Sequence, residues 1–322
     1  MMEDQIRSDF ERARQKAFRN DIISAVSGRT NDLIPFHEVR RRLSPESESY
    51  RGMQEVPVSQ IVGSMDRFRD FDRTFLPRKK ATRGRWTRID RAYYEDVRLP
   101  PIQLYKVGDI YFVKDGNHRV SVARDRGVEF IDAEVIEGHV RVPLDSSMSP
   151  QELLLQAEYA EFLRRTDLDI LEPDHDIRPT ALGRYDVIWE HIQGHRDWLS
   201  WIWHREATVH EAVKDWYTYI YMPIVRVVRD RGVLDAFPRL TEADIYLWVM
   251  KHRAELGEEA GHDIGPVESA EDYAEIMTGD RGVGDIISSA LGRTNRDPDA
   301  EVQQRRRRRR LRRWPRIRGG KA

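Results

Sequence analysis

Residues 113–127 read VKDGNHRVSVARDRG and mark an abrupt change from strand to helix. The apolar run that ends at Val113 is typical of a buried strand, and Gly116 lets the chain turn. The segment from Asn117 onward has helical spacing and closes at Gly127, a common helix end. A strand that turns into a helix in this way presents unpaired backbone N–H groups and the positive end of the helix dipole. The stretch therefore predicts an anion site of the kind that binds phosphate.

The side chains at this turn suit a phosphate in most respects. Gly116 admits a phosphate close to the backbone, and Asn117 can cap the helix. His118 and Arg119 can donate hydrogen bonds to phosphate oxygens from the first turn. Asp115 is a poor neighbour for an anion unless it holds His118, a metal or a substrate hydroxyl. The alternative is a capped helix in which Asp115 and Arg119 pair with each other, and spacing alone leaves both interpretations open.

The pattern along the chain predicts an α+β protein with two structured domains. Short strand-like runs between glycine turns fill residues 51–142, which predicts a small mixed sheet. Residues 150–260 show long helical periods, and six of the eight Trp lie between 189 and 248. Aromatic residues at helical spacing usually form a core, so we expect an all-α domain there. The remaining parts are predicted to be an N-terminal helical segment (1–50), a linker and helical segment (261–302), and a disordered tail (303–322).

The predicted tail carries charge of one sign. Residues 303–322 contain ten Arg, one Lys and no acidic residue, so residues 1–302 have a net charge of −12 although the whole chain has −1. Such a segment repels itself and cannot bury apolar area. An anionic membrane surface, or the acidic remainder of the chain, would satisfy its charge. The phosphates of DNA or RNA would do so as well, through Arg305, Arg306, Arg307, Arg308, Arg309, Arg310, Arg312 and Arg313.

Composition excludes several classes of protein. The 322 residues include no cysteine, which excludes disulfides, thiolate metal sites and cysteine nucleophiles. No apolar run approaches the roughly 18–20 residues of a membrane span, and the N-terminus lacks the apolar stretch of a signal peptide. These features together predict a cytoplasmic protein. His191 and His195 lie four apart, but no third ligand accompanies them, so we predict no metal site.

One segment of the chain is repeated. DIISAVSGRTN at 21–31 recurs as DIISSALGRTN at 285–295, with eight of eleven positions identical. The two copies could pack as a pair or bind the same kind of partner. A homodimer is a further arrangement that the sequence leaves open.

Residues 55–137 resemble the ParB/sulfiredoxin superfamily domain. EVPVSQIVGSMDRF at 55–68 resembles the opening strand and the arginine-bearing segment of that domain. LPPIQLYKVGDIYFVKDGNHRVSVARDRGVEFIDAEV at 99–135 then resembles its hairpin, its xDGxHRxxxAxxxG box and its closing strand. The sequence is most similar to bacterial proteins that pair a DGNHR box with a Trp-rich helical domain.

The resemblance implies a nucleotide site. Members bind nucleotides or act near them, so it implies that Gly116, Asn117, His118 and Arg119 hold the phosphates of ATP, ADP or CTP. It places Arg67 near the same nucleotide. Sulfinic-acid reduction, the activity of one branch, is excluded because this chain has no cysteine.

Three functions follow as hypotheses. The first is a regulatory, nucleic-acid-associated protein that binds a nucleotide phosphate at 115–119. The second is a small-molecule kinase or nucleotide hydrolase, in which Asp115 or Glu55 acts as the base and Mg²⁺ offsets the phosphate charge. A nuclease ranks last, because the chain shows no dense acidic cluster of the two-metal kind.

Overall fold

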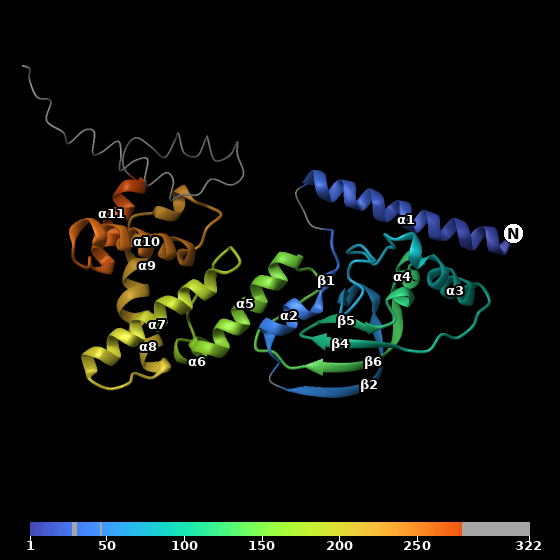
Figure 1. Cartoon of the computed structure of the whole chain (residues 1–322), viewed down its shortest axis with the longest axis horizontal. Helices are drawn as coiled ribbons and strands as arrows, with labels where there is room; N and C mark the ends of the chain where they lie inside the picture. The colour runs from blue at the N-terminus through green and yellow to red at the C-terminus, as the bar shows by residue number, and fades with distance from the viewer. Residues whose placement is uncertain (28–30, 46, 279–322) are drawn as a thin grey trace, which may run out of the picture. The chain divides into compact units, whose positions relative to one another are not determined.

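The computed structural model describes residues 1–27, 31–45 and 47–278, which Figure 1 colours by residue number. The chain divides into two compact units, residues 1–164 and residues from 165 onward. The first unit contains a mixed sheet with helices, and the described residues of the second form helices alone. The predicted α+β fold class is therefore confirmed. The tail at 303–322 and the second repeat copy at 285–295 lie outside the described residues.

Six strands form one mixed sheet in the order β1-β3-β5-β4-β6-β2. β4 and β5 pair antiparallel as the hairpin around Gly108, whereas β3 and β5 run parallel. Because β5 has a partner on each side, the turn at its end is held in place from both directions. The strands are β1 (Ile34–Pro35), β2 (Glu48–Pro57), β3 (Ile61–Ser64), β4 (Ile102–Val107), β5 (Ile110–Asp115) and β6 (Phe130–Gly138).

Helix α4 (Asn117–Asp125) packs directly on this sheet. Val120 and Ala123 of α4 are buried in one cluster with the strand residues Ile102 and Val113. Burial of an aliphatic side chain of the size of Val or Ile contributes about 1.5–3 kcal/mol. The packing therefore fixes α4 relative to β5, and with it the turn that joins them.

Helices α1 (Met2–Ser27) and α3 (Arg83–Tyr94) cover another face of α4 (Figure 1). Phe10 of α1 meets Trp86 of α3 edge-on, with ring centroids 5.6 Å apart. Trp86 Nε1 donates a hydrogen bond of 3.0 Å to Ser121 Oγ on α4. Phe10 and Trp86 belong to one buried cluster, so α1 is part of the compact unit, residues 1–164. It is wider than the module that the strands predicted over 51–142.

The first unit is completed by short elements. They are α2 (Phe36–Leu43), η1 (Val58–Gln60), η2 (Lys80–Thr82) and α5 (Pro150–Thr166), whose last two residues fall in the second unit. Phe36, at the start of α2, lies 4.8 Å from both Tyr105 and Phe112, measured between ring centroids. The sheet thus has aromatic packing as well as the α4 core.

The second unit has an aromatic core, as its Trp content predicts. Trp216, Tyr221 and Tyr246 are fully buried, and Trp216 Nε1 donates to the Tyr246 hydroxyl at 2.9 Å. Trp198, Trp201 and Trp203 are exposed instead, so the aromatic stripe is only partly core. The helices are α6 (Leu168–Leu171), α7 (Arg184–Trp203), α8 (Val209–Trp216), η3 (Tyr217–Tyr221), α9 (Met222–Asp230), η4 (Val233–Ala236), α10 (Glu242–Ala260) and α11 (Pro266–Thr278).

Local signals in the second unit have clear structural counterparts. Thr241 and Asp244 form a reciprocal capping box at the start of α10. Pro223, which lacks an N–H, follows the π-helical segment η3, and that wider turn lets α8 continue into α9. His191 Nδ1 lies 3.0 Å from the Tyr246 hydroxyl, and His195 pairs with Asp215 at 2.6 Å. Neither histidine joins a group of three metal-ligating side chains within residues 1–27, 31–45 and 47–278.

Candidate anion-binding site

The turn between β5 and α4 requires glycine at position 116. Gly116 has a φ of +111°, and a Cβ there would lie 2.4 Å from Ile102 Cγ2. Gly116 itself is the N-cap of α4, and Asn117 is the first helical residue rather than the cap that its side chain suggested. Among the described residues, no side chain forms a capping hydrogen bond at this helix end. The first N–H groups of α4 are therefore available to a ligand.

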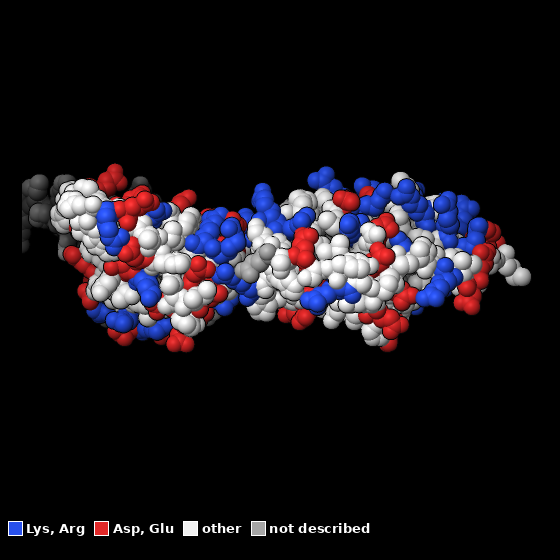
Figure 2. Space-filling view, turned by 90° about the horizontal axis from the view of Figure 1, so that it is seen from below, with Lys and Arg blue, Asp and Glu red and all other residues white. Residues whose placement is uncertain are grey.

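A cavity of about 260 Å³ opens at this helix end; we call it the α4 N-terminal cavity. Residues 115–119 line it, together with Arg67 from the loop after β3 and with Arg85, Arg88 and Ile89 from α3. The structure thus brings Asp115, the predicted 116–119 cradle and Arg67 together. Figure 2 shows Lys and Arg gathered at the end of the first unit where Figure 1 places α3.

Arg85 and Arg88 were not predicted as site residues. They lie three residues apart on α3, a spacing that puts two side chains on one helix face. Both are exposed, and in the described part of the chain no carboxylate forms an ion pair with either. Arg67, by contrast, lies 3.3 Å from Asp70. The cavity therefore carries positive charge that the surrounding protein does not neutralise.

Arg119 is already engaged by the protein. Its Nη2 lies 2.5 Å from Asp115 Oδ2, and its Nη1 donates to the carbonyls of Pro100 and Pro101 at 2.5 and 2.7 Å. The Arg119 side chain is 13% exposed and that of Asp115 is 70% exposed. The pairing of these two residues, one of the two interpretations open from the sequence, is present. Arg119 thus adds positive charge to the cavity wall, while its Nη1 is hydrogen-bonded to the Pro100–Pro101 loop.

Asn117 and His118 contribute buried polar atoms. Asn117 Oδ1 and His118 Nδ1 are buried and have no hydrogen-bond partner in the described structure. Unsatisfied polar atoms are rare in folded proteins and often mark places where a ligand or water completes the site. Burial, and then the positive charge of Arg67 and Arg85, lowers the pKa of His118 to about 4. His118 is therefore neutral near pH 7 and acts there as a hydrogen-bonding group.

Glu55 lies elsewhere. It sits on β2 opposite Asp132 of β6, at the far edge of the sheet from the turn. It lines another cavity, of about 390 Å³, which shares Arg119 and no other lining residue with the α4 N-terminal cavity. The structure does not bring Glu55 to the α4 N-terminal cavity, where Asp115 is the one carboxylate among the lining residues.

Solved structures include a distant likeness to this chain. The chain is similar to a structure described as the C2221 form of a Pnob8-like ParB-N domain, at 13% identity and a TM-score of 0.20. The match covers 76% of this chain and 98% of that one. No model of a known protein family matches the chain, and no curated protein matches its sequence. Within the described residues, no helix is long and apolar enough to span a membrane.

Proposed function

We propose that the chain is a nucleotide-binding protein of regulatory, nucleic-acid-associated function that holds phosphates in the α4 N-terminal cavity. The observation that carries this proposal is the pair Arg85 and Arg88, exposed and without carboxylate partners beside an uncapped helix N-terminus. Arginine forks and backbone N–H groups both donate to phosphate oxygens, and the helix dipole favours the negative charge. The unpartnered atoms of Asn117 and His118 add support.

The size of the cavity indicates which part of a nucleotide it would hold. Its volume of about 260 Å³ is below the roughly 300–1,000 Å³ typical of pockets that enclose a whole small ligand. We therefore expect the phosphate chain of ATP, ADP or CTP inside and the nucleoside beyond its rim. A Mg²⁺ ion would come with the phosphates, since Mg²⁺ usually keeps several waters and needs few protein carboxylates.

The arrangement favours binding over phosphoryl transfer. Asp115, one candidate base, is paired with Arg119, and Glu55, the other, lines a different cavity. The single observation in favour of a kinase or hydrolase is that the Asp115 carboxylate is 70% exposed at the phosphate site. The Asp115→Asn variant described in the Discussion distinguishes these two functions.

The test is calorimetric titration of the full chain with ATP, ADP, CTP and GTP in the presence of Mg²⁺. We expect saturable binding of at least one nucleotide, weakened about tenfold or more in the double variant Arg85→Ala/Arg88→Ala, because charge-assisted hydrogen bonds are lost. The matched control is Arg7→Ala/Arg19→Ala, which removes two exposed arginines of α1 outside the cavity. No binding by the wild type, or equal loss in both double variants, would overturn the proposal.

Association with nucleic acid is proposed for the basic tail. The support is its composition, Arg305–Arg310 with Arg312 and Arg313. Each phosphate neutralised adds about −0.9 to the slope of log K against log salt for duplex DNA. We expect a steep slope for the full chain and a much shallower one after truncation at residue 302. Identical slopes would remove the tail from the nucleic-acid interface.

A further inference from the structure

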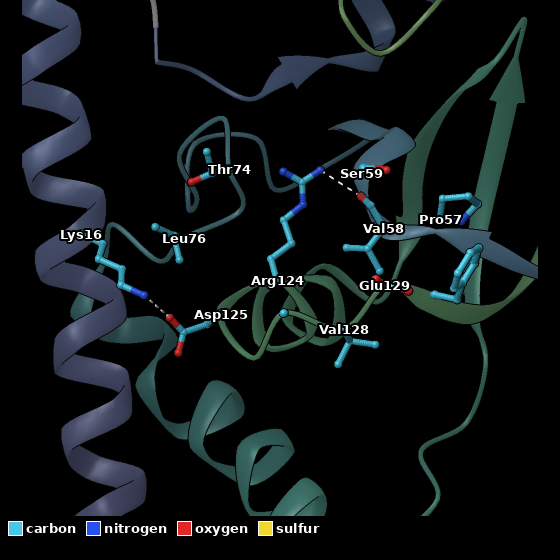
Figure 3. Close-up of a pocket in the computed structure, with 12 residues that line it drawn as sticks. Lys16, Pro57, Val58, Ser59, Thr74, Leu76, Arg124, Asp125, Val128 and Glu129 are labelled. Atoms are coloured by element: carbon cyan, nitrogen blue, oxygen red, sulfur yellow. Dashed lines mark hydrogen bonds and ion pairs between the residues drawn. The ribbon is translucent and has the colours of Figure 1, made fainter.

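A second and larger cavity lies near the other end of α4. Its volume is about 610 Å³, within the usual range for small-molecule pockets, and we call it the α4 C-terminal cavity (Figure 3). It is distinct from the proposed nucleotide site, since none of its lining residues lines the α4 N-terminal cavity. Much of its wall is apolar, formed by Pro57, Val58, Leu76, Val128 and Phe130.

Two cations line this cavity, Lys16 and Arg124, and among the described residues Arg124 is the one without an ion pair. Its Nη2 donates to the carbonyls of Val58 and Ile61 at 3.0 and 2.6 Å, and its guanidinium lies 5.2 Å from the Phe75 ring centroid. Within the described residues Arg124 forms no ion pair, and its Nη1 has no hydrogen-bond partner. Burial lowers the pKa of Arg124, and the charge of Asp72 offsets only part of this effect.

Asp72 is the acidic residue whose charge raises the pKa of Arg124, and its carboxylate accepts hydrogen bonds from other residues. Asp72 Oδ1 accepts hydrogen bonds from the backbone N–H groups of Thr74 and Leu76, and Oδ2 accepts one from Asn20. These bonds hold the loop after β3 in place, and within the described residues Asp72 forms no ion pair with Arg124. A ligand that carries an anionic group would provide the missing counter-charge.

The other polar groups limit the ligand to one anionic group. Ser59 Oγ is exposed and forms no hydrogen bond with the described residues, so it is a second donor. Lys16 of α1 lines the cavity and forms an ion pair with Asp125 (Figure 3); the two charged atoms lie 3.3 Å apart. Glu129, an exposed carboxylate on the wall, forms no ion pair in the described structure and would repel a polyanion such as a triphosphate.

We infer that the α4 C-terminal cavity binds a small organic monoanion, with its carboxylate against Arg124 and Ser59 and its apolar body against the Val128 and Phe130 wall. Arg124 Nη1 donates to one carboxylate oxygen and the Ser59 hydroxyl to the other, while Nη2 stays with the carbonyls of Val58 and Ile61. The apolar wall favours an aromatic or aliphatic body over a sugar.

The test is ¹⁹F NMR titration of the full chain with 4-fluorobenzoate. We expect saturable broadening of the fluorine signal, abolished in Ser59→Trp, which fills the cavity and leaves the residue at position 124 unchanged. Arg124→Lys keeps the charge and loses the Nη1 donor, so affinity should fall about tenfold. Because Arg124→Lys also disturbs the Val58 and Ile61 contacts, circular dichroism checks its fold, and Ser59→Trp provides the independent result.

Two controls separate this site from the rest of the molecule. Ser146→Trp places the same side chain at an exposed position outside the cavity, and the double variant Arg85→Ala/Arg88→Ala alters the α4 N-terminal cavity alone. Both should bind 4-fluorobenzoate like the wild type. The inference is overturned by the absence of saturable binding, by unchanged binding in Ser59→Trp, or by loss of binding in Arg85→Ala/Arg88→Ala.

Discussion

The two ends of α4 face cavities that differ in the source of their positive charge. At the N-terminal end the helix backbone contributes, and exposed arginines from a loop and from α3 surround a small opening. At the C-terminal end one largely buried arginine, Arg124, stands within a larger and more apolar cavity. The first arrangement suits a polyanion that stays partly in water, and the second suits an anion with an apolar body.

The difference follows from the direction of the helix. A helix N-terminus attracts anions, so residues 116–119 need only a tight turn and open N–H groups. A helix C-terminus repels anions, so a side chain must supply the charge there. Arg124 supplies it from the last turn of α4, where a cation also complements the helix dipole.

Substitution of the glycine at each end of α4 should give the largest difference between the two ends, measured as unfolding free energy. Gly116→Ala places a Cβ 2.4 Å from Ile102 Cγ2 at a φ of +111°, so we expect a loss of about 3–5 kcal/mol in unfolding free energy. Gly127→Ala also has a positive φ, +70°, but meets nothing within 4 Å, so the cost should be about 1 kcal/mol. Urea unfolding measures both. Equal costs would show that the turn at Gly116 is not sterically restricted.

His118, at the N-terminal end of α4, should make the stability of the chain depend on pH. The His118 pKa is about 4 in the folded chain and 6.5 when unperturbed, so the unfolded chain takes up a proton first as the pH falls. This group's contribution to stability is therefore complete above pH 6.5 and is lost toward pH 4. Between pH 6.5 and 5 we expect the wild type to lose about 1 kcal/mol more than His118→Gln. Parallel pH profiles in urea unfolding would contradict a buried, neutral His118.

A bound anion should raise the pKa of His118 back toward its ordinary value. Phosphate oxygens would offset the charge of Arg67 and Arg85, two of the causes that lower the His118 pKa. NMR titration of the His118 ring, with and without inorganic pyrophosphate, should show a higher pKa with the anion bound. A pKa that does not move would place pyrophosphate away from His118.

The smallest effect is expected at Asp115. Asp115→Asn removes an exposed negative charge from the α4 N-terminal cavity, so nucleotide affinity should rise about two- to threefold. Stability should change by less than about 1 kcal/mol, because exposed ion pairs contribute little. Calorimetry measures nucleotide binding, and product analysis measures turnover. Turnover by the wild type that Asp115→Asn abolishes would favour a kinase or hydrolase.

The sequence was sufficient for features with local causes. The turn at Gly116, the hairpin at Gly108 and the capping box at Thr241 each depend on residues a few positions apart. The α+β class follows from such patterns, since strand and helix periods differ along the chain.

Features that depend on distant contacts could not be predicted in this way. Arg85 and Arg88 reach the site because α3 packs against α4 through Trp86, which spacing along the chain does not reveal. Glu55 was assigned to the site from its chemistry, but the strand order places β2 beyond β6. Arg124 and Arg119 are both arginines of α4, and only the fold shows that Arg124 lines a second cavity.

The most direct test of the central claim is a crystal structure of the full chain with the nucleotide that binds most tightly in the calorimetric series. We expect phosphate oxygens within hydrogen-bond distance of the backbone N–H groups of residues 117–119 and of the guanidinium group of Arg85 or Arg88. A nucleotide whose phosphates lie outside the α4 N-terminal cavity, with that cavity unoccupied, would contradict it.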